Sequence, residues 1–211
     1  MPDRVWHTEV MTAEAVDLLR DLGARDYMRA FYLAGGTALA LHLGHRKSVD
    51  LDFFSEQTVD EDMLLSKVQD FPEFSVVAKE PQTLHCHIHR VKVSFIGYPY
   101  PMLGPVSEFA GVSVADPTDI ACMKVSAIAS RGTKRDFIDL FELAKRESLG
   151  TLLGNFQRKF AQANFNLVHV LKSLVYFADA EKDPAPDMLT SFSWGQVKQY
   201  FLTNVPTIKV T

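Results

Sequence analysis

The chain has few cysteines, no long apolar run and no excess of positive charge. Its 211 residues include two cysteines, Cys86 and Cys122, both among apolar neighbours. Two such thiols form neither a disulfide framework nor a cysteine-rich zinc cluster, which indicates a reducing compartment. The N-terminus lacks the apolar core of a signal peptide, and no apolar run is long enough to span a bilayer. We therefore expect a cytoplasmic protein with no membrane partner.

The composition is that of an ordinary globular protein. Hydrophobic residues make up 47% of the chain and charged residues 23%, which is enough for a sizeable core and an ionic surface. A net charge of −4 and a pI near 6.0 argue against a protein that coats nucleic acid through a basic surface. Local basic segments remain, at His45-Arg46-Lys47 and between Lys124 and Arg135. A nucleotide or an RNA end could bind there.

A glycine pair at the start of a helix is the first candidate site. The run Phe31 to Ala34 predicts a buried strand, and Gly35-Gly36 breaks it where the backbone turns tightly. Thr37 to Leu43 predicts a helix whose first turn would present unpaired N–H groups, and Gly44 predicts a left-handed cap. This arrangement favours an anion over the glycines.

Two aspartates on the next strand are the second candidate site. The basic connection His45 to Ser48 leads into a predicted strand, Val49 to Phe54. Alternation along the strand places Asp50 and Asp52 on one face and Val49 on the other. Two adjacent carboxylates suit Mg²⁺ that bridges to substrate phosphates. The alternative is an edge strand that carries two solvated acids.

The run GGTALALHLGHRKSVDLDFF resembles motif I of the DNA-polymerase-β-type nucleotidyltransferases, in the branch called the AbiEii/AbiGii toxin family. The resemblance implies that Asp50 and Asp52 are catalytic and bind Mg²⁺ (or Mn²⁺). It also implies that the triphosphate of a nucleotide binds to residues around the glycine turn: Gly35, Gly36, Thr37, Arg46 and Ser48.

One position departs from the family pattern. A strand after the two aspartates normally supplies a third carboxylate, and the run VKVSF, followed by YPYP, has Ser94 at that position. Serine supplies no negative charge, so a second metal ion is harder to hold and the residue cannot activate an acceptor hydroxyl as an acid group would. A catalytically degenerate protein that binds a nucleotide or a partner protein is therefore the alternative to an active enzyme.

Three histidines, His85, His87 and His89, fall on one face of a predicted strand, Thr83 to His89. They raise the hypothesis of an unrelated zinc-binding protein. The preferred interpretation puts Leu84, Cys86 and Ile88 in the core and the histidines on the solvent face.

Lys124 interrupts an otherwise apolar helix predicted from Pro117 to Ser130. A lysine there needs an anion or a route to solvent, so snorkelling at a helix edge and contact with nucleotide phosphates both stay open. In the next helix Thr133 and Asp136 fit a capping pair, which is an alternative explanation of Asp136.

The two helices KVSAIASRGTKRDFIDLFEL resemble the later motifs of the same family. The resemblance implies catalytic roles for Lys124 and Asp136, with Asp136 replacing part of the acid missing at Ser94. It implies nucleotide contacts for Lys124, Arg135 and Asp139.

We therefore expect an α/β (α+β) fold with a small mixed sheet flanked by helices and a helical C-terminal region. The predicted domains are a nucleotidyltransferase core over residues 1–115 and a helical region over 116–211 that closes the active site. Further expected elements are helices at Thr12–Leu22, Asp60–Asp70, Leu152–Gln162, Leu167–Ala178 and Trp194–Thr203, and strands at Glu73–Ala78 and Val91–Tyr98. The expected function is Mg²⁺-dependent transfer of a nucleotide from a nucleoside triphosphate to an acceptor, tRNA or protein. The resemblance implies the toxin of a bacterial toxin–antitoxin or phage-defence pair, with a cognate antitoxin as partner.

Overall fold

The structure is a computed structural model that describes residues 5–209. The chain forms two compact units. The first contains the residues up to Pro101 together with Pro105–Asp116, and the second contains Met102–Gly104 together with the residues from Pro117 onward. The predicted role of the second unit in closing an active site stays a prediction. Within residues 5–209, no helix has the length and apolarity that a membrane span requires.

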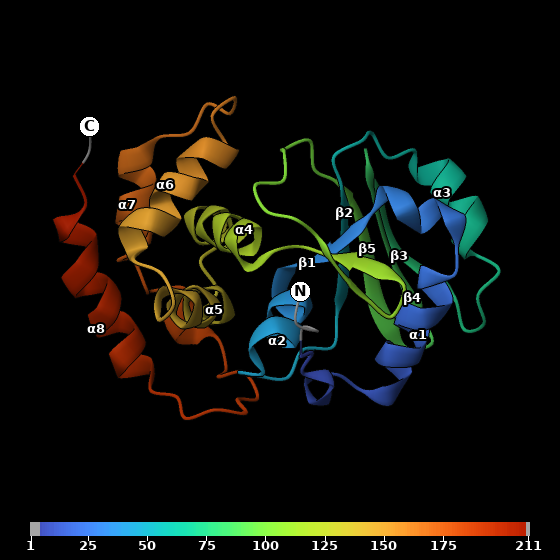
Figure 1. The fold of residues 1–211 in the computed structure, drawn as a ribbon, viewed down its shortest axis with the longest axis horizontal. Helices are drawn as coiled ribbons and strands as arrows, with labels where there is room; N and C mark the ends of the chain where they lie inside the picture. Colours follow the sequence, from blue (N-terminus) through green and yellow to red (C-terminus); the bar gives the residue numbers. More distant parts are fainter. Residues whose placement is uncertain (1–4, 210–211) are drawn as a thin grey trace. The chain divides into compact units, whose positions relative to one another are not determined.

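The first unit combines a sheet with three α-helices (Figure 1). Its helices are α1 (Ala13–Gly23), α2 (Gly35–Leu43) and α3 (Glu61–Val68). Its strands are β1 (Tyr32–Ala34), β2 (Leu51–Ser55), β3 (Ser75–Glu80), β4 (Thr83–Ile88), β5 (Val91–Gly97), β6 (Ser107–Phe109) and β7 (Val112–Val114). The side chains of Thr12 and Asp60 accept backbone N–H groups at the starts of α1 and α3, which explains where these helices begin.

The seven strands form one mixed sheet in the order β3-β4-β5-β2-β1-β7-β6. β2 runs parallel to β5, and β1 runs parallel to β7, whereas the other neighbours are antiparallel. The predicted mixed sheet is confirmed. The short strands β6 and β7 were not predicted from the sequence, because three residues are too few to show an alternating pattern.

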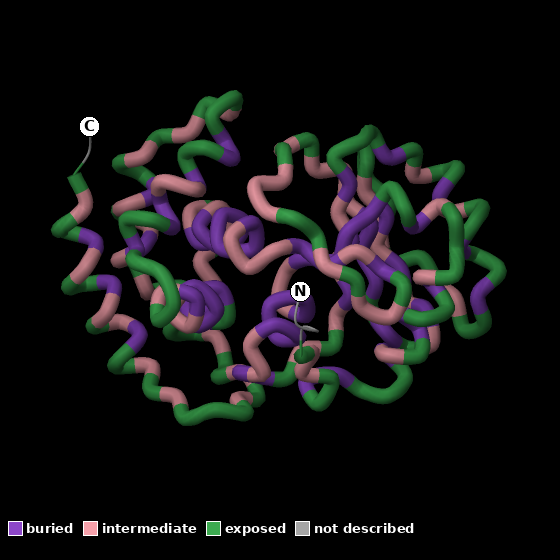
Figure 2. Tube along the Cα trace, in the orientation of Figure 1, coloured by how far each residue is buried: buried purple, intermediate pink, exposed green. Residues whose placement is uncertain are grey.

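One face of the central strands is apolar and fully buried. Leu51 and Phe53 of β2, Phe95 of β5 and Leu84 of β4 are each 0% exposed. The alternate residues of these strands lie on the opposite, more polar face, because successive side chains of a strand point to opposite sides. Buried and partly exposed residues alternate along β2 and β4. The burial of α2 is nearly continuous, and Figure 2 shows this helix mostly in purple.

The second unit is helical. It contains α4 (Pro117–Ser130), α5 (Lys134–Ala144), α6 (Leu149–Lys159), α7 (Leu167–Ser173) and α8 (Trp194–Asn204). α4 packs against α5, α6 and α7, and α5 packs against α8. The predicted helical C-terminal region is therefore confirmed, with helix bounds shifted by up to five residues.

Several local predictions are wrong. The strand predicted over Val49–Phe54 begins at Leu51, and Val49 is 51% exposed rather than in the core. The apolar pattern of residues 60–70 predicts Met63 on the inner face of the helix, but this residue is 55% exposed. The apolar run that contains Tyr176 predicts a core position, but this residue is 59% exposed. Each lies at or beyond the edge of a short apolar stripe, where periodicity does not decide which side chain turns inward.

Candidate nucleotide site

The N-terminus of α2 is formed by the glycine pair itself. The helix begins at Gly35, two residues earlier than predicted, directly after strand β1. Gly35 has a φ of +71°, in the left-handed region that disfavours residues with a Cβ atom. The preceding residue, Ala34, provides no side-chain cap. The first N–H groups of α2 are thus suited to an anion, and both glycines are half-buried rather than covered.

Arg46 lies directly against the second glycine. A Cβ atom added at Gly36 would be 2.5 Å from Nη2 of Arg46 and 3.3 Å from Oγ of Ser48. Arg46 is only 3% exposed, and its Nη1 donates to the carbonyl oxygen of Lys47 at 3.0 Å. A buried guanidinium is therefore fixed beside the first turn of α2. Both contribute positive potential at the same place.

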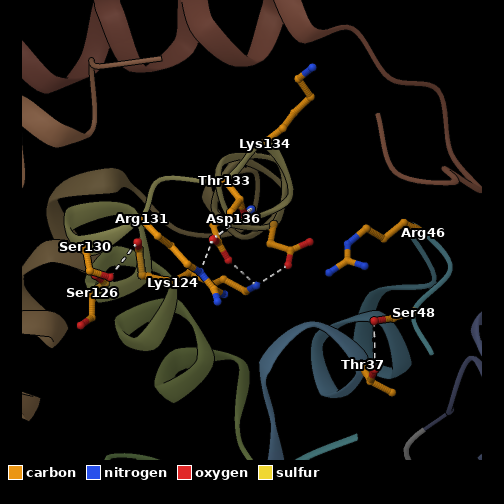
Figure 3. A network of polar contacts seen from close by, with 12 residues as sticks. Thr37, Arg46, Ser48, Lys124, Ser126, Ser130, Arg131, Thr133, Lys134 and Asp136 are labelled. Atoms are coloured by element: carbon orange, nitrogen blue, oxygen red, sulfur yellow. Dashed lines mark hydrogen bonds and ion pairs between the residues drawn. The ribbon is translucent and has the colours of Figure 1, made fainter. Parts of the chain in front are cut away.

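Hydroxyl groups connect α2 to the segment that leads into β2. The Thr37 hydroxyl donates to the backbone carbonyl of Asp50, and it lies 2.9 Å from the Ser48 hydroxyl (Figure 3). Thr37 is 1% exposed, so these contacts fix the connection after α2 from inside the unit. The predicted nucleotide-binding residues Gly35, Gly36, Thr37, Arg46 and Ser48 are thus brought together in the first unit.

The two aspartates lie at the start of β2. Asp52 belongs to the strand and Asp50 precedes its first residue, and both are half-buried. A Cβ atom at Gly35 would be 3.1 Å from Oδ2 of Asp52, so this carboxylate lies against the glycine turn. Asp50 also lines a surface hollow of about 620 Å³. Hard carboxylate oxygens beside a phosphate-binding turn fit the donor preference of Mg²⁺, and the residues present therefore suit the predicted metal.

Ser94 occupies the position beside Asp52 in the neighbouring strand. β2 and β5 pair in parallel with Asp52 opposite Ser94 and Leu51 opposite Val93. Ser94 is 3% exposed, and its Oγ lies 3.0 Å from Nδ1 of His85 on β4. The position where the resemblance implies a third acid therefore carries a buried hydroxyl bonded to an imidazole.

The histidines do not form a metal cluster. His85 and His87 lie on β4, whereas His89 lies beyond its end in the β4–β5 turn, with a φ of +48°. Among residues 5–209 there is no group of three or more His, Cys, Asp or Glu side chains placed to hold a metal ion. Leu84, Cys86 and Ile88 are fully buried, as the preferred interpretation of the sequence predicted.

A buried ionic cluster lies in the second unit (Figure 3). Nζ of Lys124 on α4 lies 2.9 Å from Oδ1 of Asp136 and 2.7 Å from Oδ2 of Asp139, both on α5. The Lys124 side chain is 8% exposed and the two carboxylates 1% and 0%. Snorkelling is therefore the wrong explanation of Lys124, because its charge stays inside and is balanced by two acids.

Asp136 is the most connected member of this cluster. It also accepts a hydrogen bond of 2.6 Å from the Thr133 hydroxyl and lies 3.3 Å from Nε of Arg131. Burial by itself would raise the pKa of Asp136, but the charges of Lys124 and Arg131 and the hydrogen bond from Thr133 hold that pKa below its usual range. The predicted capping pair is present as well, since the Thr133 side chain accepts the backbone N–H of Asp136.

Two basic residues of α5 lie in different surroundings. Arg135, a predicted nucleotide contact, is exposed, and the arginine that meets Asp136 is Arg131. Lys134 is 9% exposed and is bound to Asp183, which accepts its backbone N–H at 2.9 Å. A second buried pair, Lys159 with Asp119, was missed because the two residues are 40 positions apart and no local pattern links them.

Comparison with known proteins decides the family. Residues 17–207 match the family described as "Nucleotidyl transferase AbiEii toxin, Type IV TA system". The chain belongs to this AbiEii family. It is 35% identical over 181 residues, 83% of its length, to an uncharacterized protein of Aquifex aeolicus (strain VF5), of which the match covers 86%. The sequence resemblance to AbiEii nucleotidyltransferases is thus confirmed.

Two solved structures share the fold of this chain. MenT4, a nucleotidyltransferase toxin from Mycobacterium tuberculosis H37Rv, aligns with a TM-score of 0.55 and 17% identity, covering 94% of this chain and 87% of that one. JHP933 from Helicobacter pylori aligns with a TM-score of 0.51 and 17% identity, covering 93% and 92%. At these identities the likeness establishes the nucleotidyltransferase-like fold alone.

Proposed function

We propose that this AbiEii family member transfers a nucleotide from a nucleoside triphosphate to an acceptor. The observation that carries the proposal is the meeting of three groups at the start of α2: the glycine turn, the buried Arg46 guanidinium and the Asp52 carboxylate. The turn and the guanidinium suit the phosphates, and the carboxylate suits a cation bound to those phosphates.

The proposed metal is Mg²⁺ (or Mn²⁺), held by Asp50 and Asp52. When bound, the metal would supply charge neutralisation at the phosphates and at the leaving pyrophosphate. The residues of this chain act around it. Arg46 and the N–H groups of Gly35 and Gly36 hold the triphosphate in place, and the contacts of Thr37 with Ser48 and with the Asp50 carbonyl fix the segment that carries the aspartates.

For the residues of the second unit the proposal rests on the family resemblance. Lys124 would stabilise phosphate charge, Asp136 would orient the acceptor, and Asp139 and Arg135 would contact the nucleotide. The lowered pKa of Asp136 makes it a weak proton acceptor at neutral pH, because an efficient base has a pKa close to the working pH. We therefore assign Asp136 to orientation and not to deprotonation.

The proposed acceptor is tRNA or a protein, and the proposed partner is a cognate antitoxin. The antitoxin follows from membership of a family of type IV toxin–antitoxin toxins, whereas the acceptor rests on the sequence resemblance alone. Co-expression tests the partner: growth arrest caused by this protein should be relieved by the product of an adjacent gene.

Ser94 favours a second candidate function. Because a serine lies opposite Asp52 where the resemblance implies an acid, the protein could bind a nucleotide without transferring it. This candidate predicts tight binding of a nucleoside triphosphate with Mg²⁺ and no labelled product.

Label transfer separates the two candidates. The purified protein is incubated with each α-³²P-labelled nucleoside triphosphate, Mg²⁺ and total tRNA or cell protein, and calorimetry measures nucleotide binding in parallel. We expect label in an acceptor, lost in Asp50→Ala and Asp52→Ala and kept in Asp70→Ala, which changes an exposed acid of the same unit. Binding without transfer supports the second candidate, and transfer that survives Asp50→Ala contradicts the proposed site.

A further inference from the structure

Asp52, Ser94 and His85 form a row across three neighbouring strands. Ser94 of β5 lies opposite Asp52 of β2 on one side and opposite His85 of β4 on the other. The same register places Phe95 between Phe53 and Leu84, all fully buried, so the row lies on the opposite face of the sheet from the core. The imidazole and the candidate metal ligand thus share one face, with the serine between them.

The serine and the histidine are in direct contact. Oγ of Ser94 and Nδ1 of His85 are 3.0 Å apart, within hydrogen-bond distance. Ser94 is 3% exposed, whereas His85 is half-buried. One consequence is structural, because the bond satisfies a buried hydroxyl. A chemical consequence follows from the place of the pair beside Asp52.

A serine hydroxyl cannot keep an additional proton at neutral pH, but a neutral imidazole can accept one. A hydroxyl bonded to an imidazole can take a proton from a third group while it passes its own to the ring. The pair can therefore accept the proton that a carboxylate at position 94 would accept, but it supplies neither the negative charge nor a ligand for a second metal ion.

We propose that Ser94 and His85 form a proton relay that replaces the missing third acid; the inference rests on the proposed nucleotidyl transfer. The acceptor hydroxyl gives its proton to Oγ of Ser94 as the Ser94 proton moves to Nδ1 of His85. The acceptor oxygen forms a bond to the α-phosphorus, the bond from that phosphorus to the β-phosphate bridging oxygen breaks, and pyrophosphate leaves with the electron pair. His85 ends as an imidazolium and returns its proton to solvent.

The strand offers a matched comparison. His87 lies on the same strand and the same face as His85 and is also half-buried, but its partner in register is Lys92 rather than a serine. If the relay exists, replacing His85 by alanine should lower the rate of nucleotide transfer, whereas replacing His87 by alanine should not.

The kinetic test measures label transfer from α-³²P-labelled nucleoside triphosphate to total tRNA and to cell protein. Since general base catalysis contributes roughly 10²- to 10⁴-fold, we expect His85→Ala to lower the transfer rate by about 100-fold and free imidazole to restore part of it. Imidazole should not raise the rate of His87→Ala. Ser94→Asp combined with His85→Ala should recover activity, because an acid at 94 makes the histidine unnecessary. A wild-type rate in His85→Ala, or a loss that neither imidazole nor Ser94→Asp restores, overturns the relay.

A second measurement is independent of activity. The relay requires that neutral His85 carries its proton on Nε2, so that Nδ1 accepts the Ser94 proton. Nitrogen-15 NMR of the full-length protein distinguishes the two tautomers, and we expect the Nε2–H form in the wild type and a mixture in Ser94→Ala. An Nδ1–H form overturns the relay even if transfer is observed. If Asp50→Ala transfers label as the wild type does, or if the wild type transfers none, the proposed function is contradicted, whichever tautomer His85 adopts.

Discussion

Replacing Gly36 by alanine tests the phosphate site with a single added carbon atom. The new Cβ would lie 2.5 Å from Nη2 of Arg46, whereas ordinary contacts begin at 3.4 Å, so the guanidinium must move by roughly 1 Å. Gly36, unlike Gly35, does not have a positive φ, and alanine can therefore adopt its backbone conformation. The substitution displaces the guanidinium without breaking the start of α2.

The expected magnitude follows from the contact that is lost. A hydrogen bond to a charged group contributes about 1.5 to 3 kcal/mol, which corresponds to a roughly 10- to 150-fold change in the dissociation constant. Arg46 is 3% exposed, so the displaced guanidinium has little room to regain the same position. Alanine is a better helix former than glycine by about 0.5 to 1 kcal/mol, and the stability of the protein should change by less than the binding does.

Isothermal calorimetry with a nucleoside triphosphate and Mg²⁺ gives the binding change, and thermal unfolding gives the stability. The control is Gly154→Ala in the interior of α6, where an added Cβ meets nothing within 4 Å. We expect it to leave binding unchanged and to stabilise the protein by about 0.5 to 1 kcal/mol. If Gly36→Ala stays folded and binds the nucleotide as the wild type does, Arg46 and the glycine turn do not hold the phosphates.

The ion pairs of the second unit give two further predictions. The pKa of Asp136 is lowered, against the effect of burial, mainly by Lys124; the stability from this pair is therefore present above the ordinary carboxyl value of 3.8 and is lost as the pH falls below it. Urea unfolding should show that Asp136→Asn is less stable than the wild type at pH 7 and that the gap narrows at pH 3; a constant gap contradicts this reasoning. Lys159→Met leaves the fully buried Asp119 without its cation, which should lower the unfolding free energy by about 3 to 5 kcal/mol. Lys182→Met, which breaks an exposed pair, should leave the unfolding free energy nearly unchanged. If the two variants lose similar amounts of unfolding free energy, the burial of the Lys159–Asp119 pair is contradicted.

The sequence was most informative where one local rule decides the structure. The glycine pair, the left-handed cap at Gly44 with its φ of +65° and the side-chain cap at Thr133 were all predicted and are present. Each depends on a residue type that fits a particular backbone conformation, and neighbours in space change it little. A second local rule, the alternation of apolar and polar residues along a strand, predicted the apolar face of β4.

The sequence was least informative where charges are paired over a distance. Lys124 has the same apolar neighbours along the chain whether it reaches solvent or meets two acids on another helix. Only the packing of α4 against α5 shows that Asp136 and Asp139 balance its charge. The sequence around Asp119 and Lys159 gives no sign of their ion pair either, because neither residue interrupts an apolar pattern as Lys124 does.

The pairing of Ser94 with His85 lies between these cases, because strand register could have revealed it. The β4–β5 hairpin has His89 and Arg90 in its two-residue turn, and a turn of that length places Ile88 opposite Val91 and, three steps further, His85 opposite Ser94. The prediction extended the first strand to His89 and left one residue for the turn, which shifts every partner. Turns of this kind usually carry asparagine and glycine, since both central residues need a positive φ, and a histidine followed by an arginine gave no such signal. The β4–β5 hairpin thus places the imidazole of His85 beside the serine at position 94, which is the contact on which the proposed relay rests.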